Sequence, residues 1–198
     1  MIINAQDYLY CPICALTLGT KFEDERLIKY CSRHGEFYPQ HDIAVAGIAV
    51  RFNGKPHRKI AYNYETLMVL RNKEPHKGLW SFPAGFVNFG ERPDDALARE
   101  VNEETGLTVI RSKLIKEVVS DDDPRSPKQQ SKYYKMVVTG EVKIKDTEEN
   151  LRVEWWTLNK DAPDPQIAWA HHDELFKNLK RDRDSFTDFR IPWSSEVR

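Results

Sequence analysis

Hydrophobic residues in this chain gather into short runs that polar segments and turn-forming residues separate. Five of these runs are apolar and rich in β-branched residues, so each is predicted to be a strand. They cover Asp42 to Phe52, Thr66 to Leu70 with its end at Arg71, Val109 to Ser120, Tyr133 to Val142, and Leu151 to Leu158. A sixth apolar stretch covers residues 80–87.

Two segments have the spacing of amphipathic helices. The first is predicted to begin at Pro93, which suits the first turn of a helix, and to end at Gly106, a typical C-terminal glycine. Leu97 and Val101 lie one turn apart and can anchor this helix to a core. The second helix is predicted from Asp173 to Arg181, with an apolar stripe of Leu175, Phe176 and Leu179. Strands and helices together predict a mixed α/β domain.

Residues 85–107 carry the most specific pattern of the chain. It is G-x5-E-x7-R-E-U-x-E-E-x-G-U, where U is aliphatic, and a random match has a chance on the order of one in a billion. The fixed positions are Gly85, Glu91, Arg99, Glu100, Val101, Glu103, Glu104, Gly106 and Leu107. The glutamates at 100, 103 and 104 share one arc of the helix, and such a cluster of oxygens suits a hard cation. A solvated acidic face is the alternative for an E-x-x-E-E run taken by itself.

The pattern resembles the Nudix box at every fixed position. The resemblance implies an α/β/α sandwich with a mixed β-sheet that hydrolyses the pyrophosphate bond of a nucleoside diphosphate linked to another group, with Mg²⁺ or Mn²⁺. It also implies that Glu103 and Glu104 bind the metal and that Glu100 is a ligand or the base that activates water. The backbone carbonyl of Gly85 would complete the site, and Arg99 with Glu91 would brace the loop and helix.

Some Nudix enzymes use one more acid, from a loop outside the box, as a ligand or a base. Glu149, just before the strand that contains Trp155, is our candidate, and Glu148 is a close competitor. The alternative is that both belong to an acidic surface turn.

The second motif lies near the N-terminus. Cys11-Pro12-Ile13-Cys14 is followed after sixteen residues by Cys31-Ser32-Arg33-His34, and this spacing matches a zinc ribbon with Cys11, Cys14, Cys31 and His34 as ligands. A thioredoxin-like redox pair would leave Cys31 and His34 unexplained. A structural disulfide is less expected in a chain that shows no secretory signal. We therefore predict structural zinc.

Charge argues against a nucleic-acid role for this ribbon. Residues 1–40 hold four basic and five acidic side chains, with no basic stripe that could meet phosphates. We interpret the ribbon as a flap that folds on its metal, and it could also support a homodimer or cover the substrate cleft.

Composition fits one main domain and one small module. The 198 residues carry a net charge of −1, and 40% are hydrophobic. We predict a zinc ribbon at 1–40, a Nudix domain at 41–182 and a polar tail at 183–198. No apolar run reaches the ~20 residues that span a membrane, and no secretory signal is evident. A cytoplasmic enzyme without membrane contact is expected.

The combination of ribbon and box is similar to zinc-ribbon Nudix hydrolases, which include NADH pyrophosphatases and relatives that cleave FAD or ADP-ribose. The chain has Ser120 to Pro127, with three aspartates, where NADH pyrophosphatases carry a Ser-Gln-Pro-Trp-Pro-Phe-Pro motif. Pro124 lies seventeen residues beyond Leu107, near the proline typical of ADP-ribose enzymes. ADP-ribose is therefore the favoured substrate, with NADH, NAD or FAD as alternatives and AMP as the product.

Four side chains outside the box are candidates for substrate binding. Trp80, Phe82 and Tyr134 could stack on an adenine or nicotinamide ring, and Arg71 could meet a phosphate, although each type of residue is also common in cores and on surfaces. The stretch from Ile167 to His172 resembles an apolar-plus-His segment before the last helix of these relatives. We interpret its histidines as packing residues.

Two other classes of function stay open. A nucleotide-sensing regulator would bind ADP-ribose or NAD without turnover, but it would be expected to lose carboxylates of the box, and none is lost. An enzyme that removes NAD caps from RNA would be expected to show a basic channel, whereas the expected rim at 121–123 and 148–149 is acidic.

Overall fold

The computed structural model describes residues 9–11, 13–23, 26–37, 43–52, 64–88, 90–120, 123, 126, 129–145 and 147–181. The expected tail at 183–198 lies outside the described residues, as does most of the acidic stretch at 121–127. Within the described residues, no helix is both long and apolar enough to cross a membrane.

The main domain is a mixed sheet between two helices. Its strands follow the order β10 (Asn150–Thr157), β5 (Tyr64–Arg71), β4 (Ile43–Phe52), β9 (Gln129–Thr139) and β8 (Thr108–Ser120). Two short strands, β6 (Trp80–Ser81) and β7 (Ala84–Phe86), pair with β5 and β4. The central pair β4–β9 is parallel and joins Ile43 to Gln130, and the other pairs are antiparallel.

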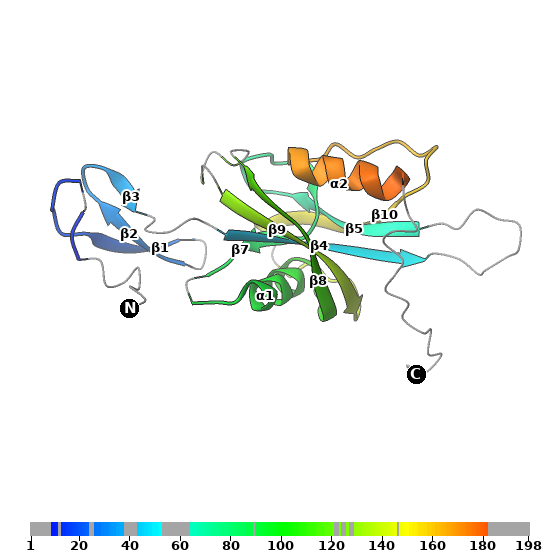
Figure 1. Cartoon of the computed structure of the whole chain (residues 1–198), viewed down its shortest axis with the longest axis horizontal. Helices are drawn as coiled ribbons and strands as arrows, with labels where there is room; N and C mark the ends of the chain where they lie inside the picture. Colours follow the sequence, from blue (N-terminus) through cyan, green and yellow to red (C-terminus); the bar gives the residue numbers. More distant parts are fainter. Residues whose placement is uncertain are drawn as a thin grey trace, which may run out of the picture.

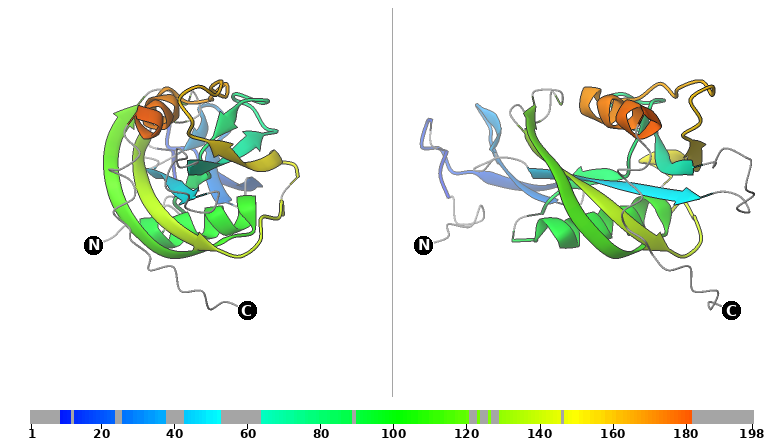
Figure 2. Two further views of the ribbon diagram at one scale, coloured as in Figure 1. Left: turned by 90° about the vertical axis from the view of Figure 1, so that its right-hand side faces the viewer. Right: turned by 45° about the vertical axis from the view of Figure 1, so that its right-hand side comes forward.

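The helices α1 (Pro93–Thr105) and α2 (Ala170–Arg181) cover opposite faces of this sheet (Figure 1). Strand β4 has apolar side chains on both faces of the sheet. Ala46 and Ile48 pack in the core cluster that contains α2 residues. Val45 and Ala49 pack in the core cluster that contains α1 residues. Alternation with a period of two thus produces two apolar faces, as expected for a central strand. The end-on view in Figure 2 shows the resulting layers. The predicted α/β/α sandwich is confirmed.

Several element boundaries differ from the prediction. The strand predicted at 133–142 lies at 129–139, because β9 pairs with β8 up to Gln129 and Gly140 then leaves the extended conformation with a φ of 106°. The stretch at 80–87 is split into β6 and β7 around Pro83, which has no N–H for a ladder. The last helix begins at Ala170, three residues earlier than predicted.

The N-terminal module is a separate three-stranded antiparallel sheet. Its strands are β1 (Gly19–Glu23), β2 (Arg26–Cys31) and β3 (Gly35–Phe37), which lie at one end of the molecule in Figure 1. The buried core beside them consists of Cys11, Leu18 and Cys31, with Cys14 packed against it. So small an apolar core is typical of modules that a metal stabilises.

Candidate active site and metal centres

Helix α1 has its carboxylates fixed by the way it begins, packs and ends. Pro93 occupies its first turn, and the left-handed Gly106 (φ 76°) ends it with a hydrogen bond from its N–H to the carbonyl of Asn102. Leu97 and Val101 are fully buried in the core below the sheet, as predicted. The glutamates at 100 and 104 consequently face β7, while Glu103 keeps 41% of its side chain exposed.

Arg99 joins the loop before α1 to the helix itself. Its Nε and Nη2 donate to the two carboxylate oxygens of Glu91 at 2.9 and 3.0 Å, and Nη2 also donates to the carbonyl of Phe86 at 2.9 Å. Its Nη1 contacts Glu100 at 2.7 Å and Glu103 at 3.1 Å. A bidentate pair of this kind fixes orientation as well as charge. The structure therefore has the Arg99–Glu91 contact that the sequence suggested.

Glu104 is a buried carboxylate held on both oxygens. One oxygen accepts from the backbone N–H of Ala84 at 2.9 Å, and the other accepts from Nδ2 of Asn150 at 3.2 Å. Burial, together with the nearby charge of Glu100, raises the pKa of Glu104 to about 8. These two donors direct both carboxylate oxygens toward the sheet edge next to Glu100.

Glu100 is partly buried, with 12% of its side chain exposed, and this burial raises its pKa to about 7 although the charge of Arg99 acts in the opposite direction. The charges of Glu103 and Glu149 raise it further. Glu149 acts on Glu104 in the same direction, so the structure brings Glu149 into the electrostatic environment of the helix carboxylates. Its neighbour Glu148 is exposed in the same turn.

Gly85 is the residue against which Glu100 packs. A Cβ placed on Gly85 would lie 1.9 Å from Cδ of Glu100 and 2.1 and 2.3 Å from its two oxygens. Only glycine permits this approach between strand β7 and the carboxylate. The steric conflict with Glu100 therefore explains why position 85 of the box is a glycine.

The carboxylate cluster fits a hard divalent cation. It offers only oxygen donors, and burial together with mutual repulsion raises the pKa values of Glu100 and Glu104, so a bound cation would stabilise their ionised forms. Glu100, Glu103 and Glu104 are the residues that could hold it. The carbonyl of Gly85 as a ligand stays a prediction.

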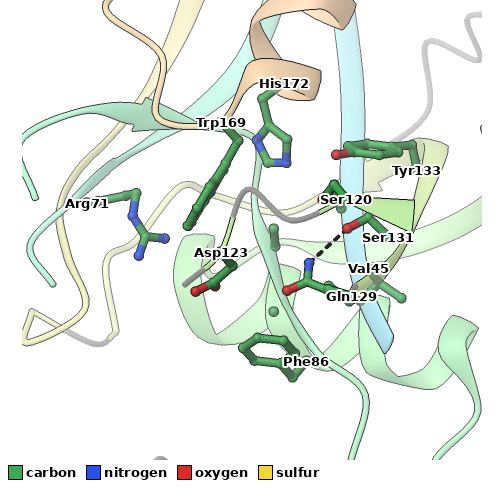
Figure 3. A pocket seen from close by; sticks show the side chains of 14 residues that line it. Val45, Arg71, Phe86, Ser120, Asp123, Gln129, Ser131, Tyr133, Trp169 and His172 are labelled. Carbon is green, nitrogen blue, oxygen red and sulfur yellow. Dashed lines mark hydrogen bonds between the residues drawn. The ribbon is translucent and has the colours of Figure 1, made fainter. Parts of the chain in front are cut away.

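A pocket lies on the other side of β7, toward α2. Its walls come from β4, β5, β7, β9 and the residues around the start of α2, and they include Arg71, Phe86, Asp123, Trp169 and His172 (Figure 3). The guanidinium of Arg71 lies 5.3 Å from the centre of the Trp169 ring, close enough for a cation–π contact. Gly85 and Ala84 also line this pocket.

The four residues that were predicted to contact the substrate fall into two groups in the structure. Arg71 lines the pocket. Trp80, Phe82 and Tyr134 are 7%, 0% and 5% exposed and pack in the two cores, so burial supports a packing role and gives no support to base stacking.

Sequence reasoning did not select three of the pocket residues. Trp169 and His172 come from the stretch before the last helix, whose histidines we interpreted as packing residues, and Asp123 comes from the acidic loop. His172 does pack, since it is 4% exposed and contacts Phe82, but it also forms part of the pocket wall.

The four predicted zinc ligands come together in the N-terminal module. One ligand atom from each of Cys11, Cys14, Cys31 and His34 lies within 4.8 Å of all the others. The Cys11–His34, Cys14–Cys31 and Cys31–His34 pairs are 3.5, 3.5 and 3.7 Å apart, close to the edge of about 3.8 Å expected for tetrahedral zinc with thiolates. The three cysteines are free, which excludes the disulfide alternative in this structure.

Backbone N–H groups support the thiolate form that zinc needs. The N–H of Arg33 donates to Sγ of Cys31 at 3.4 Å. Although burial acts to raise it, the N–H groups of Cys14 and Ile13 bring the pKa of Cys11 down to about 6. The donor set and its surroundings therefore fit zinc.

A sheet between two helices, with a carboxylate-bearing helix beside a pocket, defines a Nudix-fold hydrolase. The NUDIX domain model matches residues 42–179, and the chain belongs to that family. An ADP-ribose pyrophosphatase of Methanocaldococcus jannaschii is 30% identical over 171 residues, covering 85% of this chain and 91% of that protein.

Solved structures share the fold at lower identity. A MutT NUDIX hydrolase from Burkholderia pseudomallei has a TM-score of 0.57 at 22% identity, covering 71% of this chain and 98% of that one. The NUDIX domain of Shewanella oneidensis NrtR, solved with ADP ribose, also has a TM-score of 0.57, at 20% identity, covering 77% and 92%. At these identities the likeness concerns the fold.

Proposed function

We propose that this protein hydrolyses the pyrophosphate bond of an ADP-linked nucleotide, with ADP-ribose as the favoured substrate and AMP as a product, in a reaction that needs Mg²⁺ or Mn²⁺. The observation that carries the proposal is the position of Gly85. It packs against Glu100 on one side and lines the pocket on the other. A nucleotide bound in the pocket would thus present its diphosphate to the carboxylate cluster across a single strand.

The roles of the side chains follow from their contacts. Glu100, Glu103 and Glu104 would hold the cation, which when bound would neutralise the diphosphate and lower the pKa of a bound water. Arg99 and Glu91 keep the loop and helix together. Either Glu100 or Glu149 would accept the proton of the attacking water. In the pocket, Arg71 and Trp169 would meet the nucleotide.

The relative from Methanocaldococcus jannaschii, which is named an ADP-ribose pyrophosphatase, supports the choice of substrate. The complete set of box carboxylates supports hydrolysis over sensing. A relative from Macaca fascicularis named NAD-capped RNA hydrolase is 29% identical over 111 residues, which are 21% of that protein, so capped RNA belongs among the substrates to test.

The deciding experiment is a product assay with Mg²⁺ on ADP-ribose, NADH, NAD⁺, FAD, diadenosine polyphosphates and NAD-capped RNA. A Glu103→Gln/Glu104→Gln variant should lose activity. Glu174→Gln is the matched control, because Glu174 is an exposed carboxylate on α2 paired with Lys116. Release of AMP from ADP-ribose, abolished only in the double variant, supports the proposal. Measurable binding of ADP-ribose without turnover of any substrate would replace it with the sensor.

We also propose that the N-terminal module binds structural zinc through Cys11, Cys14, Cys31 and His34, because one ligand atom from each lies within 4.8 Å of the others. A homodimer and a cytoplasmic location remain predictions. The dimer would account for exposed apolar side chains on the module, such as Tyr10, Ile13 and Phe22, and light scattering at several concentrations would test it.

A further inference from the structure

The protonation state of His172 is fixed by its surroundings. Its Nδ1 accepts a hydrogen bond from the backbone N–H of Phe82 at 3.2 Å. A backbone N–H can only donate, so Nδ1 carries no proton and a neutral ring must carry its proton on Nε2. Burial, together with the charges of Arg71 and His171, lowers the pKa of His172 to about 3, so the ring is neutral near pH 7.

The Nε2–H of His172 is therefore a hydrogen-bond donor on a residue that lines the pocket. Within the described residues, the bond from Phe82 is the hydrogen bond that His172 makes. The ring cannot turn to another partner without losing that bond, and the rings of Phe82 and Tyr133 pack against it at 5.4 and 5.5 Å. The Nε2–H is therefore a preorganised donor for a ligand in the pocket.

The same pocket contains an acceptor and a surface for stacking. Asp123 is 5% exposed, and its carboxylate offers only acceptors when ionised. Trp169 supplies an aromatic ring (Figure 3), and the lining also includes the small side chains of the alanines at 44, 46 and 84. A ligand that suits these groups would offer an acceptor to His172, a donor to Asp123 and a flat face to Trp169.

Resting on the proposed function, we propose that this pocket holds the purine of the nucleotide and selects a 6-aminopurine, with His172 donating from Nε2 to a ring nitrogen and Asp123 accepting from the exocyclic amino group. A 6-oxopurine has the opposite pattern, since it carries an acceptor at position 6 and a donor at position 1. It would set an acceptor against the carboxylate of Asp123 and a donor against the Nε2–H of His172, and enzymes reject analogues through mismatches of this kind.

The test compares binding of AMP and IMP by titration calorimetry, first to the wild-type protein. We expect AMP to bind about tenfold more tightly or better.

His172→Asn keeps an oxygen near the position of Nδ1 that can accept from the N–H of Phe82, but it has no atom that reaches the position of Nε2. The preference for AMP over IMP should therefore fall to within about twofold. His172→Gln restores an N–H near the Nε2 position and should recover most of it. Asp123→Asn adds a donor and should improve binding of IMP relative to AMP.

Thermal melts of each variant show whether it is folded, and ribose 5-phosphate is the third ligand. Equal binding of AMP and IMP to the wild type, or no binding of either, would overturn the inference. So would ribose 5-phosphate binding as tightly as AMP, because the pocket would then hold the sugar. An intact preference in folded His172→Asn would also overturn it.

Hydrolysis separates this inference from the proposed function. If ADP-ribose and its inosine analogue are hydrolysed with equal kcat/KM, the function holds and the purine selection fails. If neither is hydrolysed but AMP binding depends on His172, the selection holds and the hydrolase proposal fails.

Discussion

Asn150, at the start of β10, donates from Nδ2 to a carboxylate oxygen of Glu104 on α1 at 3.2 Å, and the two residues are 46 positions apart in the chain. Asn150 is 1% exposed, so its amide has been removed from water to make this contact. The bond from Asn150 fixes Oε1 of Glu104, while the backbone N–H of Ala84 fixes Oε2. Asn150 is thus a positioning residue for a proposed metal ligand, and nothing in the sequence pattern pointed to it.

Replacing Asn150 by alanine should therefore weaken activity through Glu104. Loss of a residue that orients a metal ligand typically lowers metal affinity or activity about 10- to 100-fold. Steady-state kinetics over a range of Mg²⁺ concentrations would measure it. Asn102→Ala is the matched control, because Asn102 bonds the carbonyl of Leu107 outside the carboxylate cluster. An equal loss of activity in both variants would indicate a general effect on stability.

Gly85→Ala should destabilise the protein and reduce activity, because the new Cβ would meet the Glu100 carboxylate at about 2 Å. Chemical denaturation of a double-mutant cycle with Glu100→Ala isolates this clash. We expect the cost of Gly85→Ala to be large in the wild type and small once the carboxylate is absent. Equal costs in the two backgrounds would show that the strain has another source.

The proposed zinc site predicts one zinc atom per chain by elemental analysis. Cys31→Ser should lose the metal and the order of the N-terminal module, because its small core includes two of the cysteines. His34→Cys should retain zinc, since thiolate is also a zinc ligand. Zinc retained after Cys31→Ser, or lost from His34→Cys while the main domain stays folded, would contradict the four-ligand assignment.

His172 predicts a pH dependence of stability. Its pKa is about 3 in the folded protein and about 6.5 when unfolded, so between these values the unfolded chain binds the extra proton. Its contribution is fully present well above pH 6.5 and is lost as the pH falls through 6.5 toward 3, by about 2 kcal/mol between pH 7 and pH 5.

Urea denaturation of wild type and His172→Asn at pH 5 and pH 7 would measure that loss. The asparagine does not titrate, so the difference in unfolding free energy between the two proteins should change with pH by this amount. Parallel pH profiles would contradict the buried, neutral state of His172.

Much of the fold and of the carboxylate cluster could be predicted from local pattern. The strand at 43–52 and the helix at 93–105 were evident because apolar spacing and terminal residues such as Pro93 and Gly106 act over a few positions. The contact of Arg99 with Glu91 also follows from short-range geometry. These features depend on neighbours in the sequence.

The pocket could not be predicted in the same way. Trp169, Asp123 and Arg71 come from three segments that only the folded sheet brings together. Burial also determines whether an aromatic residue packs in a core or faces a ligand, and this separates Phe82 from Trp169. Phe82 and Trp169 are both aromatic, so residue type alone could not show which of them packs in the core and which lines the pocket.

The parallel pairing of β4 with β9 also affects how the protein is made. Ile43 and Gln130 are register partners 87 positions apart, and β10, which carries Asn150, comes later still. Because a ribosome releases the chain from its N-terminus, the helix α1 with its glutamates emerges before β9 and β10 have been synthesised. The carboxylate cluster consequently acquires the contact from Asn150 late in synthesis, and a chain that stops before β10 would carry every residue of the Nudix box without the amide that holds Glu104.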